Sequence, residues 1–474
     1  MTYEENSGDV GGVQLPIPSS SVTVGDLRGS SNLLGGIAPR PPVSGGDSAV
    51  VENPELVNGQ DADGKLGLYL DFNSATYPNG PQPIRGGRGG TDPGPRTYEY
   101  EKLNPDIYAP PETDQGTVPQ AMWPLGLSYN LFGVGHESGW ARQQNQDVLP
   151  VATAMAGVDM RLAPNAYREL HWHTSAEWAL VLKGSVRVAA IDTDGASFVD
   201  DITAGDVWFF PQGVPHSLQA LDEGAEFLLV FDSGTFSEES TFLATEMLMR
   251  SPVSVWSKDL QVDVSALDGI PDAEKYIFNG TPAPANISEQ NITSSAGSLW
   301  GESAYTYHWS LQEFHNTTGG SVKILDPLTF PAASMFSAAL VVLQPGAMRE
   351  VHWHTDSDEW NYFLQGSARI TIYGAPSQSQ TFDFTAGDVG YIQKAAGHYI
   401  ENTGTEDVIF LEMLQAKKFS DISAAQWLAL TPRQIIKDTL NLTDEVLDKI
   451  PKDKTLIKPG NPNMTAIAVG GQNF

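Results

Sequence analysis

The sequence predicts an all-β protein in which two similar jelly-roll β-barrels follow one another, each with a short α-helical pair after it. Runs of alternating apolar and polar residues, separated by Gly, Pro and Asp turns, fill residues 131–230 and are typical of a small antiparallel barrel. A set of His and Glu residues in this half recurs in the same order in the second half, and such repetition marks two copies of one domain. The length of 474 residues has room for two to three domains.

The first copy carries a candidate metal site within residues 168–184 and shortly after them. His171 and His173 are two residues apart, so they share one face of an extended strand and can chelate one ion. Glu177 opens an apolar run that looks like the returning strand of a hairpin, which brings a carboxylate beside the histidines. His216 follows on another short strand bounded by Gly and Pro turns. Three His and one Glu would leave two open positions on an octahedral divalent ion.

The second copy repeats these ligand types in the same order, with one inserted residue between the His pair and the Glu. Its members are His352, His354, Glu359 and His398. A single His-x-His pair could equally be a pair of surface or core histidines, but chance does not account for two matching sets. The sequence therefore predicts two divalent metal sites. Such ligands accept manganese, iron, zinc or copper, and intrinsic affinity favours copper or zinc over manganese.

Charge and composition exclude several kinds of partner. The chain has 27 basic and 58 acidic residues and a net charge of −31, so nucleic acid and anionic membranes would be repelled. Carboxylates take up protons near their unperturbed pKa of about 4, which relaxes this self-repulsion in acid and suits a protein that works at low pH. The absence of cysteine removes disulfides, thiolate ligands and cysteine nucleophiles. The apolar runs are too short to span a bilayer.

We expect a secreted glycoprotein. The first residues lack the basic start and apolar core of a signal peptide, so the expectation is a mature secreted form. Four acceptor sequences for N-glycosylation cluster in a segment rich in Gly, Pro, Ser and Thr between the two copies, which indicates an exposed, glycosylated linker. The acceptor positions are Asn279, Asn286, Asn291, Asn316, Asn441 and Asn463.

Composition and the repeat also predict the domain order. Residues 1–80 are rich in Gly, Pro, Ser and Asp with little periodicity, which predicts an extended, partly disordered extension. A Ser-Pro or Thr-Pro helix start follows each barrel, at Ser251 and Thr431. The other expected parts are an N-terminal arm (81–130), a first barrel (131–260), the linker and entry to the second barrel (261–320), a second barrel (321–430), and a C-terminal helix and tail (431–474).

Two short motifs make the chain resemble a known family. The pattern Gly, five residues, His-x-His, three or four residues, Glu, six residues, Gly is complete from Gly346 to Gly366, and the first copy has Asn165 in place of its first Gly. In the second pattern, Gly, five residues, Pro-x-Gly, two residues, His, three residues, Asn, the first copy lacks only the Asn and the second lacks the Pro and the second Gly. From about residue 81 onward the chain resembles the bicupins, and among them the oxalate decarboxylases of the fungal secreted type.

The resemblance implies two cupin barrels with one manganese ion in each and dioxygen as a co-catalyst. It implies the conversion of oxalate to formate and carbon dioxide, with dioxygen required but not consumed. It also implies that the N-terminal arm packs on the second barrel. We further expect a homo-oligomer.

Two arginines precede the histidine pairs. Arg168 and Arg349 each lie three residues before the first His, on the opposite alternation of the strand unless a bulge intervenes. They are either outward structural residues or guanidinium forks that bind a carboxylate beside the metal. The resemblance favours the second alternative, because the family uses the Arg at this position to hold and polarise its substrate.

An acidic stretch follows the last strand of the first barrel and by composition alone would be a solvated loop. In oxalate decarboxylases the matching segment is a lid, and the resemblance makes Glu238 its general acid and base. The second copy has Asp421 at this position and Glu412 where the first has Leu229. The other residues of the stretch, taken as lid residues, are Ser237, Glu239, Ser240 and Thr241.

Two other functions are open alternatives at the level of sequence. An oxalate oxidase would release hydrogen peroxide and two molecules of carbon dioxide when no lid acid protonates the intermediate. A storage or sugar-binding bicupin would have no catalysis, but such proteins commonly lack part of the ligand set, whereas both sets here are whole.

Overall fold

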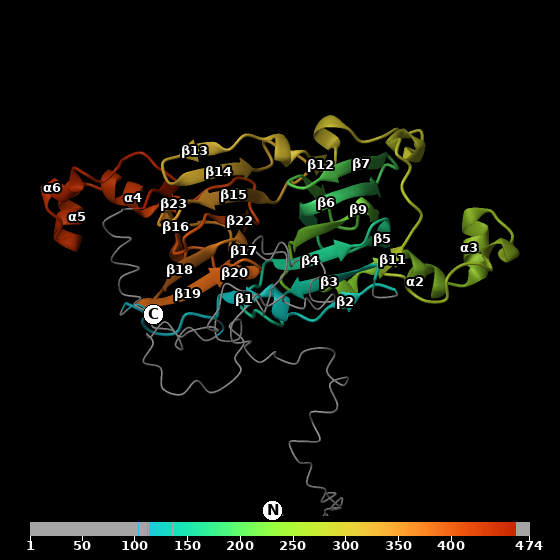
Figure 1. Cartoon of the computed structure of the whole chain (residues 1–474), viewed down its shortest axis with the longest axis horizontal. Helices are drawn as coiled ribbons and strands as arrows, with labels where there is room; N and C mark the ends of the chain where they lie inside the picture. Colours follow the sequence, from blue (N-terminus) through green and yellow to red (C-terminus); the bar gives the residue numbers. More distant parts are fainter. Residues whose placement is uncertain (1–102, 104–110, 112, 135–136, 461–474) are drawn as a thin grey trace, which may run out of the picture. The chain divides into compact units, whose positions relative to one another are not determined.

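The computed structural model of this chain describes residues 103, 111, 113–134 and 137–460, which form two β-barrels and a few short helices (Figure 1). The extension expected over residues 1–80 lies outside the described residues, as do most of the arm before residue 113 and the end of the tail. The predicted all-β architecture of two barrels is confirmed. No helix in the described part is long and apolar enough to cross a membrane.

Barrel 1 is a single antiparallel sheet of 11 strands. Its strands are β2 (Leu131–Phe132), β3 (Gly139–Gln144), β4 (Ala156–Leu162), β5 (Ala166–Trp172), β6 (Glu177–Ile191), β7 (Ser197–Thr203), β8 (Val207–Phe210), β9 (His216–Phe231), β10 (Phe242–Leu243), β11 (Ile277–Asn279) and β12 (Thr306–Tyr307). The order is β12-β8-β6-β9-β4-β3-β2, and β5, β7, β10 and β11 pair off this path. The long strands β6 and β9 pair with each other through two register shifts, which bend both strands around the core.

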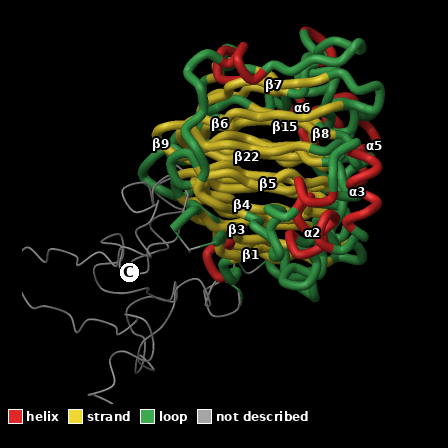
Figure 2. The backbone as a smooth tube through the Cα atoms, turned by 90° about the vertical axis from the view of Figure 1, so that its right-hand side faces the viewer, coloured by secondary structure: helices red, strands yellow, loops and turns green. Residues whose placement is uncertain are grey.

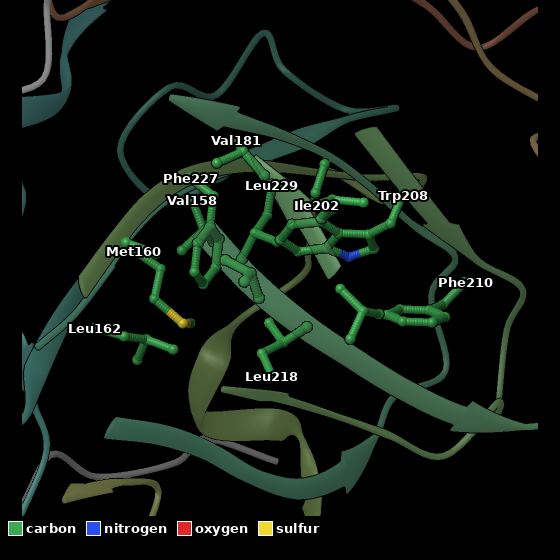
Figure 3. Close-up of a cluster of buried hydrophobic side chains, with 14 of the residues drawn as sticks. Val158, Met160, Leu162, Val181, Ile202, Trp208, Phe210, Leu218, Phe227 and Leu229 are labelled. Carbon is green, nitrogen blue, oxygen red and sulfur yellow. The ribbon is translucent and has the colours of Figure 1, made fainter. Parts of the chain in front are cut away.

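Alternation along the strands fills the interior of barrel 1. Val158, Met160 and Leu162 of β4 point inward, where they join Phe227 and Trp208 in one buried cluster (Figure 3). Because successive side chains of a strand face opposite ways, the residues between them face the outside of this barrel.

Barrel 2 consists of a seven-stranded and a six-stranded antiparallel sheet, in the orders β1-β20-β17-β22-β15-β14-β13 and β19-β18-β21-β16-β23, with β24 paired to β16. In Figure 2 the strands of the molecule lie one above the next. The strands of barrel 2 are β1 (Met122–Pro124), β13 (His315–Thr317), β14 (Gly320–Leu325), β15 (Ser337–Leu343), β16 (Met348–Trp353), β17 (Glu359–Gln365), β18 (Ser367–Gly374), β19 (Gln378–Thr385), β20 (Asp388–Ile392), β21 (Gly397–Asn402), β22 (Val408–Leu414), β23 (Ile422–Ser423) and β24 (Ile457–Lys458).

Each barrel takes a strand from a segment outside its own repeat. β1 lies before barrel 1 in the chain but pairs with β20 of barrel 2, with Met122 opposite Gly390. β12 lies in the expected linker but pairs with β8 of barrel 1, with Thr306 opposite Trp208. The segment 261–320 is therefore more than a connection, since it contributes β11 and β12 to barrel 1.

A second apolar cluster joins the outer faces of the two barrels. Trp178 and Val230 from barrel 1 pack with Trp360 and Met413 from barrel 2, and all four are buried. The Trp360 indole N–H donates to Gln144 Oε1 of barrel 1 at 2.7 Å. The two barrels consequently share one core at their interface.

Short helices follow each barrel, as expected. They are α2 (Ala244–Met249) and α3 (Val253–Leu260) after barrel 1, and α4 (Ala424–Leu430), α5 (Arg433–Leu440) and α6 (Asp444–Leu447) after barrel 2. Pro252 and Pro432 directly precede α3 and α5, where the missing N–H costs nothing. Gln261 and Asn441 end these two helices in the left-handed conformation.

Two of the departures from the motifs fall on turns that keep their backbone shape. Asn165 stands for a Gly and has a φ of 64°, close to the 75° of Gly346 in the second copy. Ala395 likewise has a φ of 64° where Gly213 of the first copy has 75°. Asn tolerates this left-handed region better than Ala does, so the strain is greater at Ala395.

Buried charges lie on the outer face of barrel 1. Arg142 stands opposite Asp159 on the neighbouring strand, and Glu226 stands between Arg161 and Lys183. Asp159 and Glu226 are each 2% exposed. Burial raises the pKa of Asp159 to about 7, although Arg142 and Arg161 oppose this, and burial also raises the pKa of Glu226 well above its usual value.

We expect Asp159 to make the protein more stable in acid. The pKa of Asp159 in the folded state is raised from its usual value of 3.8 to about 7. Its contribution to stability is therefore complete below pH 3.8 and is lost as the pH rises through about 7. Asp159→Asn should gain stability relative to the parent as pH rises, by on the order of a few kcal/mol. Denaturant unfolding of metal-free protein across this range measures the difference, with the exposed Glu223→Gln on β9 as control. A difference that stays constant with pH would contradict this assignment.

Candidate metal centres

The structure gathers the predicted ligands into two clusters, one in each barrel. Within each cluster the candidate ligand atoms all lie within 4.8 Å of one another, and all the residues are buried. The first contains His171 of β5, His173 directly after it, Glu177 at the start of β6 and His216 at the start of β9; the second contains His352 of β16, His354 directly after it, Glu359 at the start of β17 and His398 of β21.

All six imidazole rings are held through Nδ1. Each Nδ1 lies 2.5 to 3.0 Å from a backbone carbonyl oxygen. A carbonyl only accepts hydrogen bonds, so Nδ1 carries the proton and Nε2 keeps a lone pair for the interior of the cluster. The carbonyls belong to Glu169, Ser175 and Val214 in the first cluster and to Glu350, Ser420 and Ala396 in the second.

Each glutamate is fixed by one oxygen and offers the other. Trp208 Nε1 donates to Glu177 Oε1 at 2.6 Å, and Asn361 Nδ2 donates to Glu359 Oε1 at 2.8 Å. Oε2 then faces the imidazoles, 3.0 Å from His173 Nε2 in the first cluster. Trp208 and Asn361 do not occupy matching positions in the two copies, so a comparison of the copies could not identify them as partners of the glutamates.

The electrostatics of both clusters fit a divalent cation. Nε2 of His216 and of His352 lie 3.7 and 3.8 Å from their glutamate oxygens, too far for a hydrogen bond, although both imidazoles are buried. Burial by itself would lower the pKa of His354, but the carboxylates of Glu359 and Glu412, which lie 2.8 and 3.3 Å from its Nε2, raise it to about 10, so this cluster attracts positive charge. Three Nε2 atoms and one carboxylate oxygen would satisfy a metal ion in each barrel.

A bulge brings each arginine to the same side as the histidines. The register of β5 against β9 shifts between Arg168 and His171, and that of β16 against β21 shifts between Arg349 and His352. An extra residue reverses the alternation, so both guanidinium groups face the interior, where each is 1% exposed. The sequence had left this open.

The acidic stretch after β9 closes over Arg168. Glu238 is 4% exposed, and its Oε2 accepts a hydrogen bond from Arg168 Nη2 at 3.1 Å. Thr241 Oγ1 accepts from the same nitrogen at 3.1 Å and donates to the Glu238 carbonyl at 2.8 Å. The remaining residues of the stretch, which are exposed or half-buried, are Ser237, Glu239 and Ser240.

Two residues that the sequence did not single out hold Glu238 in this place. The Tyr276 hydroxyl donates to Glu238 Oε2 at 3.1 Å, and the Tyr276 ring lies 4.4 Å from the guanidinium carbon of Arg168. Burial raises the pKa of Tyr276 well above its usual value, so this hydroxyl keeps its proton. Gln143 Oε1 accepts from the Glu238 backbone N–H at 2.9 Å. Both come from segments without a motif.

The second centre surrounds its arginine with more charge. Arg349 Nη2 donates to Asp421 Oδ2 at 2.7 Å and to Glu412 Oε1 at 3.4 Å. Glu412 also lies 3.3 Å from His354 Nε2. Lys454 forms an ion pair with Asp421 and donates to its backbone carbonyl at 3.0 Å. Two cations thus hold the acid of the second centre, and its arginine has two carboxylate partners, whereas a tyrosine and a glutamine assist the single arginine that holds the acid of the first centre.

We expect two metal ions per chain, held independently. His216→Ala and His398→Ala should each remove about one ion, because losing one of four ligands leaves the other three without their geometry. Elemental analysis after dialysis measures the content. His308→Ala, at a histidine outside both clusters, is the control, and full occupancy in both ligand variants would refute the assignment.

Comparison with known proteins agrees with this geometry. Residues 134–267 and 311–448 match the family model described as Cupin. Oxalate decarboxylase OxdC of Bacillus subtilis (strain 168) is 42% identical over 374 residues, which are 79% of this chain and 96% of that protein. Oxalate decarboxylase of Arthroderma benhamiae is 36% identical over 406 residues, 79% of this chain and 93% of that one.

Solved structures give the same result. A structure of Bacillus subtilis oxalate decarboxylase, determined in a study of its Mn(II) centres, has a TM-score of 0.75 and 41% identity, and the match covers 80% of this chain and 100% of that one. A formate complex of oxalate decarboxylase from Lactobacillus farciminis has a TM-score of 0.70 and 46% identity over 73% of this chain and 100% of that one. With two cupin matches and relatives of this similarity along both barrels, the chain belongs to the cupin family, as a bicupin of the oxalate decarboxylase group.

Proposed function

We propose that this protein is a manganese-dependent oxalate decarboxylase, which converts oxalate to formate and carbon dioxide and requires dioxygen without consuming it. Its family membership supports this function. The site observation that carries it is Arg168, which keeps two buried donors, Nε and Nη1, without a hydrogen-bond partner among the described residues. A cation with free donors beside a metal cluster suits a small dicarboxylate.

The first centre would bind oxalate between the metal and Arg168. A manganese ion held by the three imidazoles and Glu177 would bind the substrate and exchange one electron with it. Arg168 would neutralise and polarise the substrate, because its charge is buried and acts through a medium of low dielectric constant. This local cation also offsets the net charge of −31, which otherwise disfavours an anionic substrate.

Glu238 would act twice on one proton. Its Oε2 is occupied by Arg168 and Tyr276, which leaves Oε1 to take the proton of hydrogen oxalate. The carbon–carbon bond then breaks, carbon dioxide leaves, and Glu238 returns the proton to the carbon of the remaining fragment as formate forms. Because the electron exchanged with the metal would be given back, the atoms and charges of hydrogen oxalate equal those of formate and carbon dioxide.

We assign this chemistry to barrel 1. The Glu238 position is Asp421 in barrel 2, where two cations bind the carboxylate instead of one. Arg349 also has Glu412 as a partner. Arg349 Nε, which corresponds to a free donor of Arg168, donates to Glu412 Oε2 at 3.4 Å, so among the described residues Arg349 keeps one unpartnered donor, Nη1, where Arg168 keeps two.

An oxalate oxidase is the alternative within enzymes, and its products distinguish it. An oxidase returns no proton to carbon and releases hydrogen peroxide. The buried Glu238 beside Arg168 supports the decarboxylase. A storage function has no support in two complete ligand clusters.

Secretion, N-glycosylation and homo-oligomerisation remain predictions. Support for glycosylation comes from exposure, since every acceptor asparagine in the described part of the chain is exposed: Asn279, Asn286, Asn291, Asn316 and Asn441. Asn463 lies outside the described residues.

Glu238→Gln should lower formate production by about a hundredfold or more, because an amide keeps the shape of the side chain but cannot carry the proton. Metal content should stay unchanged. Assays of formate, carbon dioxide and peroxide from oxalate, with parallel metal analysis, measure both quantities. Asp421→Asn is the matched change in barrel 2 and should matter much less. If Asp421→Asn lowers formate production more than Glu238→Gln does, our assignment of catalysis to barrel 1 is wrong. Hydrogen peroxide produced by the parent protein would favour the oxidase.

Arg168→Lys should lose about tenfold to a hundredfold in kcat/KM, because one ammonium group cannot serve Glu238, Thr241 and a carboxylate from the fixed planar fork of a guanidinium. Steady-state kinetics at the pH optimum, which we expect in mild acid, measures the loss. The same substitution at Arg349 is the control and should cost less. A fully active Arg168→Lys variant would remove the basis for the proposed substrate contact.

A further inference from the structure

A pocket of about 350 Å³ opens on barrel 2 beside the second metal cluster. Ile324, Phe419 and Leu456 form apolar parts of its lining. Its charged lining is Asp421 and Lys454, which form an ion pair with each other. Metal binding by the two ligand clusters does not require this pocket.

In barrel 1 the corresponding place is filled by Glu238 together with Gln143 and Tyr276, the two residues that hold it. We call these three residues the Glu238 clasp. Gly139 and Gly320 begin matching strands, opposite Leu162 and Leu343. By the same register, Ile324 takes the position of Gln143, the residue that binds the Glu238 backbone. One of the two residues that hold Glu238 is thus replaced by an apolar residue in barrel 2.

The second replacement follows from another pair of matching strands. Ile277 of β11 lies opposite Arg168, and Ile457 of β24 lies opposite Arg349. Leu456 therefore takes the position of Tyr276, whose hydroxyl binds Glu238 in barrel 1. Two polar clasp residues of barrel 1 are apolar in barrel 2, and the space that they leave is part of the pocket.

A short series of contacting side chains connects the pocket with the ligands of the second centre. Asp421 lines the pocket and binds Arg349, which binds Glu412, and Glu412 lies 3.3 Å from His354 Nε2. Phe419 also lines the pocket, and its ring centroid lies 6.1 Å from that of His354. The side chain of Asp421 is fully buried, whereas that of Lys454 is 27% exposed. Lys454 is thus the outermost member of this chain of charges.

We propose that this pocket is the entrance to the second metal centre and that Lys454 is the positioning residue that keeps it shut, by holding Asp421 against Arg349. Hydrated metal ions would pass here when the pair between Lys454 and Asp421 opens. The described residues of barrel 1 offer no counterpart to Lys454, because the register of β11 and β24 places Glu274 at its position. The inference rests on the proposed function in one respect, namely that the second cluster holds a metal ion.

The test uses full-length His216→Ala protein, in which only the second centre should be loaded. Manganese uptake by metal-free protein and manganese release to a chelator are both timed by the Mn(II) resonance signal. Lys454→Met should accelerate both uptake and release to a similar extent, by roughly fivefold to tenfold, because the ion pair that must open is lost. Leu456→Trp, which fills the pocket, should slow both.

Lys458→Met is the matched control. The side chain of Lys458 is also 27% exposed and lies 3.4 Å from Glu350 Oε2, but it does not line the pocket. Its uptake and release rates should equal those of the background. If Lys454→Met accelerates release alone, Lys454 merely stabilises the bound metal and the entrance is refuted. Unchanged rates in Leu456→Trp would also refute it.

A failure of the premise that the second cluster holds a metal ion would give a different result. If His216→Ala protein binds no manganese at all, the second centre itself is wrong. If it binds one ion whose exchange ignores both Lys454 and Leu456, the centre stands and the entrance falls.

Discussion

The hydrogen bond from each imidazole Nδ1 to a backbone carbonyl is the interaction on which both centres depend. It fixes the tautomer, so that Nε2 has a lone pair toward the cluster, and it fixes the ring plane. Because the acceptor belongs to the backbone, the barrel rather than any neighbouring side chain sets the direction of the ligand. The same barrel can therefore carry two similar clusters while the side chains around them differ.

Those outer side chains give the two centres separate characters. Around Arg168, a single carboxylate is supported by neutral donors from Tyr276 and a neutral acceptor from Gln143. Around Arg349, two carboxylates are balanced by Lys454. The added positive and negative charge cancel, so the difference lies in mobility and access more than in net charge. An acid held by one cation and neutral partners moves at lower cost than one held between two cations.

Local patterns in the sequence were sufficient for the ligands, because period two and short turns decide which residues of a strand share a face. His171, His173 and Glu177 follow from such local rules. The bulge behind Arg168 could not be predicted, since an extra residue in one strand shows only against its partner. Tyr276 and Gln143 reach Glu238 from distant segments, and only the folded sheet brings them there. The pairing of β12 with barrel 1 escaped prediction for the same reason, whereas the two-barrel fold and an N-terminal arm on the second barrel were expected.

Strands β1 and β12 also determine where the chain can be divided, because each lies outside the repeat whose sheet it completes. β1 precedes barrel 1 and completes a sheet of barrel 2, while β12 follows barrel 1 and completes that barrel from the connecting segment. A cut between the repeats leaves β20 of the second fragment with a bare row of N–H and C=O groups, which another chain can pair with. Neither repeat is therefore a self-sufficient folding unit, and fragments cut at the repeat boundaries would each lack a strand of their own barrel.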